Sequence, residues 1–438
     1  MSVAAEKVRE VLGQNILADG FDTIQDLDKS HGSWIVDERN GKEYLDMFSM
    51  FASGAIGYNH PRLVENQNLL GRVALSKPTL SDIYNSDYAE FVRVFDEIAI
   101  PDYLKHAFFV EGGALGVENA LKIAFDWKVR KNMEAGKGEK GLKVIHFKQA
   151  FHGRTGYTLS LTNTSDPRKT MYFPKFDWPR VDNPYLRFPI TDEVIDEVKI
   201  KEAATMAQIK DAIASYPDDI AALIMEPIQG EGGDHQFRDE FFVQLRQVCD
   251  ENEIIFILDE VQTGIGITGK MWAHEHYSVN PDVIAFGKKA QVCGALAGPR
   301  IDEVEKNVFK ESSRINSTFG GNLTDMIRFK IILEVIKEEN LVENARVKGE
   351  YLLGKLQGLA EEFPGFVTNP RGVGLFAAFD LPSGTERDHA WGKMMENNLL
   401  ILTSGDQAIR FRPHLNVSTE DIDTAMDIIT TSLKDSLR

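Results

Sequence analysis

Four short apolar runs, each followed by polar or glycine-rich sequence, constrain the fold of this chain more than any other feature. The runs are rich in β-branched residues and alternate with stretches of helical periodicity, which is typical of strands buried on both faces of an α/β protein. In open α/β sheets, ligands bind beyond the carboxyl ends of the strands. We therefore expect an α/β fold with a largely parallel sheet and one active site at that edge. The runs are residues 143–147, 220–225, 253–258 and 282–286.

The composition argues against several classes of protein. The chain has 438 residues and carries 49 basic against 67 acidic side chains, a net charge of −18. Such an acidic chain lacks the basic surface that nucleic-acid binding needs, and its two cysteines cannot build a disulfide framework. No apolar run approaches the roughly 18 residues that span a bilayer, and the N-terminus reads as a polar helix rather than a signal peptide. We expect a cytoplasmic protein that binds neither nucleic acid nor membranes.

The two ends of the chain differ from its middle. Residues 1–61 contain short amphipathic pieces, and after about residue 322 an apolar helical face is followed by strand-like segments. A last helix is expected from Ser418, with acidic residues in its first turn. These patterns predict a large central domain, residues 62–321, and a smaller α+β domain built from residues 1–61 and 322–438. The strand-like segments of the smaller domain are residues 376–380, 400–403 and 409–412.

Three polar features are expected at the carboxyl edge of the sheet. Gly112, Gly113 and Ala114 precede a helical pattern, so free backbone N–H groups would face a phosphate there, although a simple tight turn has the same pattern. Asp259 follows a strand and can hold a cationic ring nitrogen or act as a base, or it can merely cap a helix or lie in solvent. Metal binding has no partner residues at a suitable spacing. Lys288 also follows a strand, where loss of solvent would make its amine a nucleophile rather than a solvated cation.

Taken together, a phosphate nest, a carboxylate and a lysine at strand ends are the parts that hold pyridoxal phosphate. The lysine carries the aldehyde as an imine, the carboxylate keeps the pyridine nitrogen protonated, and the helix start binds the phosphate. Phe151 follows another predicted strand and would lie against the ring, unless it is a core aromatic.

Two other motifs point elsewhere. Residues 264–269 match the G-x-G-x-x-G dinucleotide fingerprint, but five residues separate them from the preceding strand, and two acids would face the pyrophosphate. We therefore do not expect a dehydrogenase. The pair His274 and His276 is too close in sequence to place both rings on one helical face, so we expect this stretch to be exposed to solvent.

The sequence resembles the class III pyridoxal-phosphate aminotransferases of fold type I over nearly the whole chain, from residues 44–46 and 57–61 to 410–413. This resemblance implies a large domain with a mostly parallel sheet and a smaller α+β domain from both termini. Four longer stretches are similar to the lysine 6-aminotransferase branch, whose nearest competitor is the 4-aminobutyrate aminotransferases. Cys293 and Gly294 depart from the wider class but support the branch. The four stretches are residues 111–122, 151–164, 286–294 and 316–322.

The resemblance also implies roles around the cofactor. Lys288 matches the Schiff-base lysine, Asp259 the partner of the pyridinium nitrogen, and Gln262 the residue near the phenolic oxygen and the substrate. Thr318 matches a phosphate ligand that the neighbouring subunit donates, which implies a homodimer with composite active sites. The phosphate nest is matched by Gly113 and Ala114.

For the substrates, the resemblance implies that Arg154 binds the distal carboxylate and Arg410 the α-carboxylate of the 2-oxo acid, with Asn316 a further substrate contact. Two arginines suit a dicarboxylate such as 2-oxoglutarate. A lysine that enters by its ε-amine would leave Arg410 unpaired, which is costly in a desolvated site. Glu231, which the resemblance pairs with Arg410, can neutralise this arginine for lysine and swing away for 2-oxoglutarate, or the two form a permanent salt bridge.

We therefore expect an aminotransferase that moves the ε-amino group of L-lysine to 2-oxoglutarate through Lys288. The products would be glutamate and 2-aminoadipate 6-semialdehyde, which cyclises to 1-piperideine-6-carboxylate. The alternatives are 4-aminobutyrate or ornithine as amino donor, or a homologue that binds ligand without catalysis.

Overall fold

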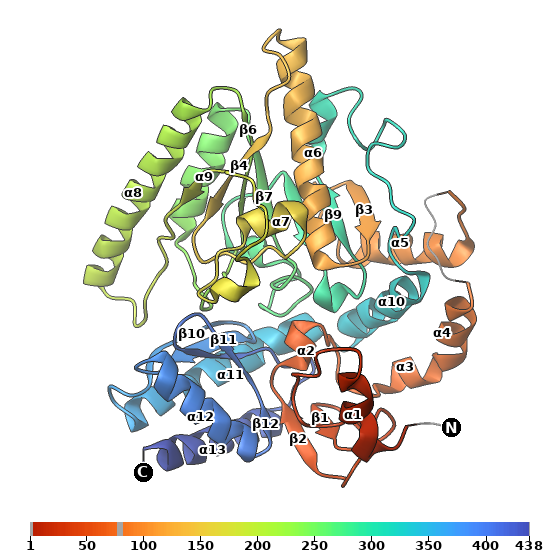
Figure 1. Cartoon of the computed structure of the whole chain (residues 1–438), viewed down its shortest axis with the longest axis vertical. Helices are drawn as coiled ribbons and strands as arrows, with labels where there is room; N and C mark the ends of the chain where they lie inside the picture. The colour runs from red at the N-terminus through yellow and green to blue at the C-terminus, as the bar shows by residue number, and fades with distance from the viewer. Residues whose placement is uncertain (1–2, 77–81, 438) are drawn as a thin grey trace.

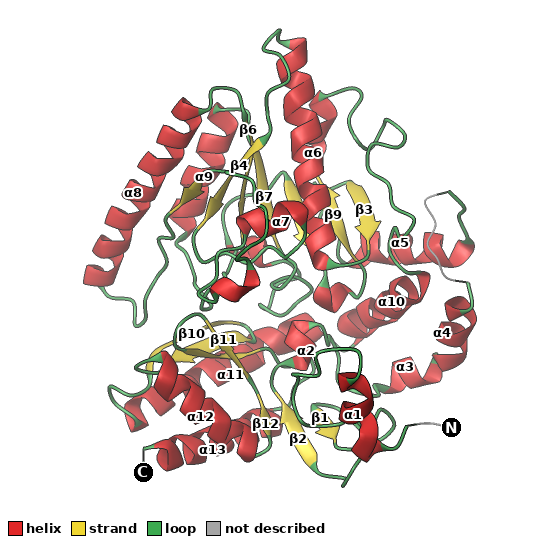
Figure 2. Ribbon diagram, viewed as in Figure 1, coloured by secondary structure: helices red, strands yellow, loops and turns green. Residues whose placement is uncertain are grey.

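The computed structural model describes residues 3–76 and 82–437. The upper part of the view in Figure 1 holds a seven-stranded sheet among long helices, and the lower part holds a three-stranded and a four-stranded sheet beside both chain ends (Figures 1 and 2). The domain boundaries given above remain a prediction. Within the described residues, no helix combines the length and the apolar composition that crossing a membrane requires.

The large sheet confirms the predicted α/β class. Its third to seventh strands run parallel to one another, while β9 is antiparallel to both of its neighbours. Glu253 was predicted to begin a strand, but its positive φ of 52° ends the preceding helix, so the strand begins at Ile255 and continues to Asp259. The strand order is β3 (His106–Val110), β9 (Cys293–Ala297), β8 (Val283–Phe286), β7 (Ile255–Asp259), β6 (Ile220–Met225), β4 (Lys143–Phe147) and β5 (Arg180–Val181).

Burial on both faces explains the continuous apolar runs. In β6, Leu223 and Met225 pack into the core on one face of the sheet, and Ala222 and Ile224 pack into the core on the other. The helix α6 (Gly113–Glu134) contacts β6, β8 and β9, while α9 (Asp239–Glu251) contacts β7 and α8 (Asp192–Ser215). Because these helices shield the sheet from water, the central strands β6, β7 and β8 stay apolar until they reach its carboxyl edge, whereas β4 also contains Lys143 and the buried His146.

The smaller sheets join the two ends of the chain. The first contains β1 (Trp34–Val36), β2 (Glu43–Asp46) and β12 (Leu399–Leu400). The single strand expected over 400–403 is therefore wrong: Ile401 lies between β12 and β13, and its carbonyl accepts a hydrogen bond from the Trp391 indole at 2.7 Å. The second sheet is antiparallel and contains β10 (Thr368–Val373), β11 (Phe376–Asp380), β14 (Ala408–Phe411) and β13 (Leu402–Ser404).

Two helix predictions had different outcomes. The last helix, α13 (Thr419–Ser436), begins as predicted, because the Ser418 hydroxyl accepts from the Asp421 N–H at 2.9 Å. The prediction of a single apolar face after residue 322 is wrong. The buried residues of α10 (Leu323–Glu338) lie on all sides of the helix, because it packs against four other helices. Those neighbours are α3 (Pro61–Glu65), α4 (Gln67–Ala74), α5 (Ser86–Ile98) and α11 (Leu341–Glu362). The remaining helices are α1 (Val8–Gly13), α2 (Ser49–Ala52), α7 (Gly156–Leu161) and α12 (Gly384–Glu396).

The glycine-rich segment 264–269 forms tight turns and is followed by the short 3₁₀ helix Ala273–His276 rather than by an α-helix. A Cβ on Gly264 would lie 2.7 Å from the Trp272 ring, and one on Gly269 would lie 2.9 Å from Cα of Arg346. These glycines therefore allow close packing, and because no α-helix begins at the segment, it cannot bind a pyrophosphate in the manner of a dinucleotide fold.

Gly349, inside α11, makes a closer backbone contact and provides a test of this packing. A Cβ at this position would lie 2.1 Å from the carbonyl carbon of Gly374, which is backbone and cannot rotate away. Gly349→Ala should therefore lower the free energy of unfolding by about 1–3 kcal/mol. Gly354→Ala is the matched control, since nothing lies within 4 Å of its added Cβ, and it should raise stability by up to about 1 kcal/mol. Urea unfolding that finds both changes stabilising would contradict this packing.

Candidate active site

The structure places one cavity of about 310 Å³ at the carboxyl edge of the large sheet. Glu226 follows β6, Asp259 ends β7 and Lys288 follows β8, so the strand ends converge on the cavity as predicted. Seven of the predicted site residues line it together with four others. The lining residues are Gly113, Ala114, Phe151, His152, Gly153, Arg154, Glu226, Asp259, Val261, Gln262 and Lys288.

Asp259 is buried rather than solvated, and His152 is its partner. His152 Nδ1 lies 2.7 Å from Asp259 Oδ2, and the backbone N–H of Val261 donates to Oδ1 at 3.0 Å. Burial alone would lower the pKa of His152, but the hydrogen bond and charge of Asp259, with the charge of Glu226, raise it above its ordinary value. The imidazole therefore stabilises the ionised carboxylate at the cavity wall. Sequence reasoning missed His152, although it directly follows Phe151.

Glu226 is a second buried acid of the cavity that sequence reasoning missed. Its carboxylate accepts from the backbone N–H groups of Phe151 at 2.9 Å and Gly230 at 3.1 Å. Burial, aided by the charge of Asp259, raises its pKa to about 7 against the opposing charge of His152. Its position directly after a fully buried strand was the available signal.

Lys288 faces the cavity, whereas Lys289 does not line it. Lys288 has a positive φ of 53°, and its Nζ donates to the carbonyl of Phe51 at 2.8 Å. Burial, followed by the charges of Arg410 and Arg412, lowers the pKa of Lys288 to about 8. Lys289 is buried and donates to the carbonyl of Ala52 at 2.9 Å. The first lysine of the pair is therefore the amine available for chemistry.

The segment that receives these hydrogen bonds is a left-handed turn. Ser49, Met50, Phe51 and Ala52 have φ angles of 42°, 52°, 58° and 67°. This conformation costs roughly 1–2 kcal/mol for each such residue. The lysine loop offsets part of this cost, since Lys288, Lys289 and Gln291 donate to three successive carbonyls, those of residues 51, 52 and 53.

Arg410, on β14, forms the predicted pair with Glu231. Its Nη2 donates to Glu231 Oε2 at 2.8 Å, and its side chain is only 3% exposed. Within the described residues, the buried Nε and Nη1 of Arg410 have no hydrogen-bond partner. Although burial would raise the pKa of Glu231, Arg410 and Lys169 together hold it below the ordinary value, so Glu231 is ionised. Lys169, which sequence reasoning missed, donates to the other carboxylate oxygen, Oε1.

Arg154 and Gln262 both line the cavity, and they are held differently. The Arg154 guanidinium is exposed and lies 6.0 Å from the centre of the Phe151 ring. Gln262 accepts at Oε1 from Nε of the buried Arg412 at 2.9 Å. That hydrogen bond directs the amide nitrogen of Gln262 away from Arg412, so it can donate to an oxygen of a bound group.

Four predicted residues are not among those that line this cavity: the paired Glu231 and Arg410, and the loop residues Asn316 and Thr318. The latter two are exposed on the loop that precedes α10. The loop packs on its own chain through a hydrogen bond from the Glu111 N–H to the Phe319 carbonyl at 3.4 Å. The donation of Thr318 to a neighbouring subunit therefore stays a prediction.

The exposure expected for His274 is wrong. This residue is buried, with Nδ1 2.9 Å from Glu260 Oε1 and Nε2 hydrogen-bonded to Tyr103, whereas His276 is exposed as expected. Glu260 also accepts from the backbone N–H groups of residues 273 and 274, so it is tied up beside the site rather than in it. Among residues 3–76 and 82–437, no group of three His, Cys, Asp or Glu side chains is arranged to hold a metal ion.

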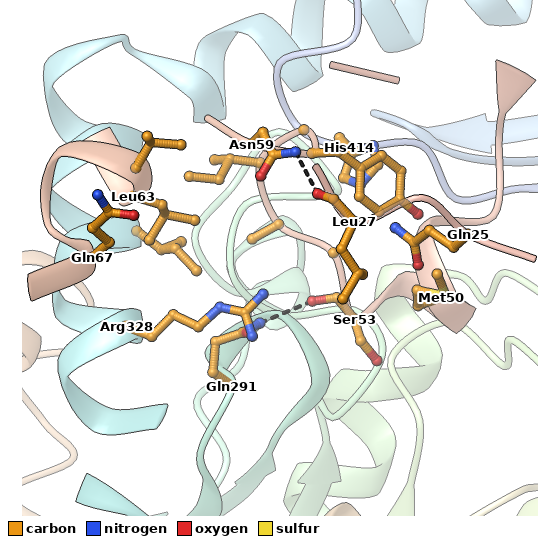
Figure 3. Close-up of a pocket in the computed structure, with 17 residues that line it drawn as sticks. Gln25, Leu27, Met50, Ser53, Asn59, Leu63, Gln67, Gln291, Arg328 and His414 are labelled. Atoms are coloured by element: carbon orange, nitrogen blue, oxygen red, sulfur yellow. Dashed lines mark hydrogen bonds between the residues drawn. The ribbon is translucent and has the colours of Figure 1, made fainter. Parts of the chain in front are cut away.

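A second cavity, of about 560 Å³, is lined by Met50 of the left-handed turn, by Ser53 directly after that turn, and by Gln291 (Figure 3). Arg328, Gln67 and Gln25 also line it. Its lining residues include neither a carboxylate nor a primary amine. The carboxylates and the primary amine that were predicted for the site are therefore in the smaller cavity, although His414 and Ser53 also line the larger one.

Comparisons with known proteins agree with this geometry. The model of the family described as aminotransferase class-III matches residues 18–433. An L-lysine-epsilon aminotransferase of Mycobacterium tuberculosis is 50% identical over 98% of this chain and 95% of its own length. One from Streptomyces clavuligerus is 44% identical over 98% and 94%. The solved structure of a lysine aminotransferase from M. tuberculosis has a TM-score of 0.97 at 49% identity, covering 99% of this chain and all of that one.

The pKa of Lys288 gives a test of the site. In protein freed of cofactor, acylation of this amine by acetic anhydride should rise with pH about a midpoint near 8, because only the neutral amine reacts. Arg410→Met should move the midpoint up and Glu231→Gln should move it down, since the two charges act in opposite directions on Lys288. Peptide mapping across the pH series measures each midpoint. A midpoint near 10.5, the ordinary value for lysine, would show that the amine is solvated.

Proposed function

The chain belongs to the class-III aminotransferases, and we propose that it transfers the ε-amino group of L-lysine to 2-oxoglutarate. The products are glutamate and 2-aminoadipate 6-semialdehyde, which cyclises. The observation that carries this proposal is the buried Arg410, whose Nη2 donates to Glu231 and whose Nε and Nη1 have no hydrogen-bond partner in the part of the chain that the structure describes. Such an arginine suits a site that must bind one substrate with a carboxylate next to the reacting carbon and another substrate without one.

Enzymes of this class use pyridoxal phosphate, and the residues around the cavity fit it. Gly112 gives α6 no side-chain cap, so the free N–H groups at Gly113 and Ala114, with the helix dipole, would hold the phosphate. Asp259 would hold the protonated ring nitrogen, Phe151 would lie against the ring, and the amide of Gln262 would reach the phenolic oxygen. When bound, the group supplies an electron sink for the bonds at the amino carbon.

Lys288 is the group that would attach the cofactor and move protons. An amine with a pKa near 8 is close to the working pH, so it can accept a proton and return it. Burial and the two arginines produce this value, and Glu231 opposes them. Lys288 thus has the proton affinity that a general acid–base catalyst needs at a reacting carbon.

The two substrates use the same cavity with different charges. Both would place a far carboxylate at Arg154, whose guanidinium is exposed beside Phe151. 2-Oxoglutarate brings a second carboxylate, which can accept from Nη2 and a neighbouring donor of Arg410 bidentately once Glu231 has left Nη2. Lysine brings only its ε-amine to that end, so Glu231 must then remain on Arg410.

We also propose a cytoplasmic homodimer in which Asn316 and Thr318 of each chain complete the site of its partner. The support is that both residues are exposed and lie away from the cavity of their own chain, on a loop whose sequence matches the family pattern.

Single-turnover kinetics of the two half-reactions test the substrate proposal. Glu231→Ala should raise the activation free energy of the half-reaction with lysine by up to about 3–5 kcal/mol, because Arg410 is then a buried cation without a partner. Arg410→Ala should do the reverse, harming 2-oxoglutarate while sparing lysine. Arg154→Ala serves as the reference, because it should harm both halves.

Ornithine and 4-aminobutyrate are run as competing amino donors in the same experiment. Faster turnover with either one than with lysine would overturn the donor assignment. Equal slowing of both halves by Glu231→Ala and Arg410→Ala would show that the pair is a permanent salt bridge.

A further inference from the structure

Glu231 has a second cation besides Arg410. Lys169 ends a short 3₁₀ helix, Pro167–Lys169, and its Nζ donates to Oε1 of Glu231. Arg410 donates to Oε2, so each carboxylate oxygen has its own positive partner. The three side chains come from separate parts of the fold: the segment after α7, the loop after β6, and β14. They are 18%, 24% and 3% exposed, respectively.

The acid nearest to Lys169 in sequence is already paired, so Lys169 is available to Glu231. Asp166, the nearest acid in sequence, is held by Arg168 through two hydrogen bonds of 2.8 and 3.0 Å. Among the described residues, Glu231 is the acid with which Lys169 forms its ion pair. Lys169 also lies 5.9 Å from the centre of the Phe151 ring, so it is close to the cavity without lining it.

We propose that Lys169 is a specificity-determining positioning residue, which holds Glu231 while Arg410 binds the α-carboxylate of the 2-oxo acid. This inference rests on the proposed function. If Glu231 left Arg410 and had no other partner, its carboxylate would be a poorly solvated, uncompensated charge. The free-energy cost of that charge would weaken the binding of 2-oxoglutarate. Because Oε1 stays on Lys169, Glu231 can release Oε2 from Arg410 and keep one charge-assisted hydrogen bond.

With lysine as substrate, Lys169 has little effect on binding. Glu231 then remains on Arg410, and the loss of Lys169 leaves that pair intact. Lys169 therefore favours the dicarboxylate half of the reaction selectively, whereas a residue that bound the far carboxylate, as Arg154 is proposed to do, would act on both halves.

Lys169→Met tests this, since methionine keeps an unbranched stem and removes the amine. We expect glutarate, an unreactive dicarboxylate, to bind the holoenzyme about 10-fold more weakly by calorimetry, as expected for one hydrogen bond to a charged group. The dissociation constant of 2-oxoglutarate in its half-reaction should rise by the same factor, with the half-reaction of lysine changed less than about 2-fold.

Lys175→Met is the matched control, because Lys175 lies in the same segment, is exposed, and donates to the carbonyls of Thr170 and Phe173. It should leave both measurements unchanged. If it weakens glutarate binding as Lys169→Met does, the effect comes from the fold of the segment and the proposal is wrong.

The pair Lys169→Met and Glu231→Ala completes the test as a double-mutant cycle. Once Glu231 is removed, Lys169→Met should weaken glutarate binding no further, because the two residues act as one unit. Additive losses, or an equal loss in the lysine half-reaction, would mean that Lys169 touches the substrate itself and would overturn this inference. Failure of the proposed function is recognised separately, because Glu231→Ala alone would then slow both halves equally.

Discussion

This site depends on one constraint: each charged side chain that is buried away from water needs a partner of opposite charge. Charged side chains gather in and around the cavity, and a buried charge persists only with a partner and hydrogen bonds. Asp259 has His152, Asp234 has Arg412, and Glu231 has Arg410 and Lys169. Each acid comes from the large sheet or the loops that follow it.

The arginine partners link these loops to the four-stranded sheet. Arg410 and Arg412 belong to β14 and the residue after it, and both reach acids of the loop that follows β6. The same loop is fixed by backbone contacts, since the Gly405 N–H donates to the Glu231 carbonyl at 2.9 Å and Arg371 donates to the Gly233 carbonyl at 2.6 Å. A rigid backbone with a movable carboxylate is what a change of partner at Glu231 requires.

The strand ends were the part of the site that sequence could predict. A buried strand must be apolar until it leaves the sheet, so the first charged residues after it, such as Asp259 and Lys288, stand out in the sequence. Strands β3 and β9 gave no such signal. Four of the five residues of β9 are Cys, Gly or Ala, and β3 approaches so closely that a Cβ on Gly294 would lie 2.0 Å from the Phe108 carbonyl oxygen.

Partners were harder to predict than positions. His152 and Lys169 contact acids 107 and 62 residues away, and no local pattern encodes such pairs. The same reason explains the error at His274, whose acid, Glu260, reaches it through a turn that the spacing did not reveal. Residues 316 and 318 needed knowledge of the family, because their own chain gives them no place in the cavity.

The central claim is that Glu231 leaves Arg410 when a dicarboxylate binds and stays on Lys169. The most direct measurement is a crystal structure of the holoenzyme with glutarate bound, compared with one without it. We expect a glutarate carboxylate on Nη2 of Arg410 and on one of the neighbouring donors, Nε or Nη1, with Glu231 moved off Nη2 but still within hydrogen-bond distance of the Lys169 amine. A carboxylate of Glu231 that stays on Arg410 beside bound glutarate, or that leaves both cations, would contradict the account.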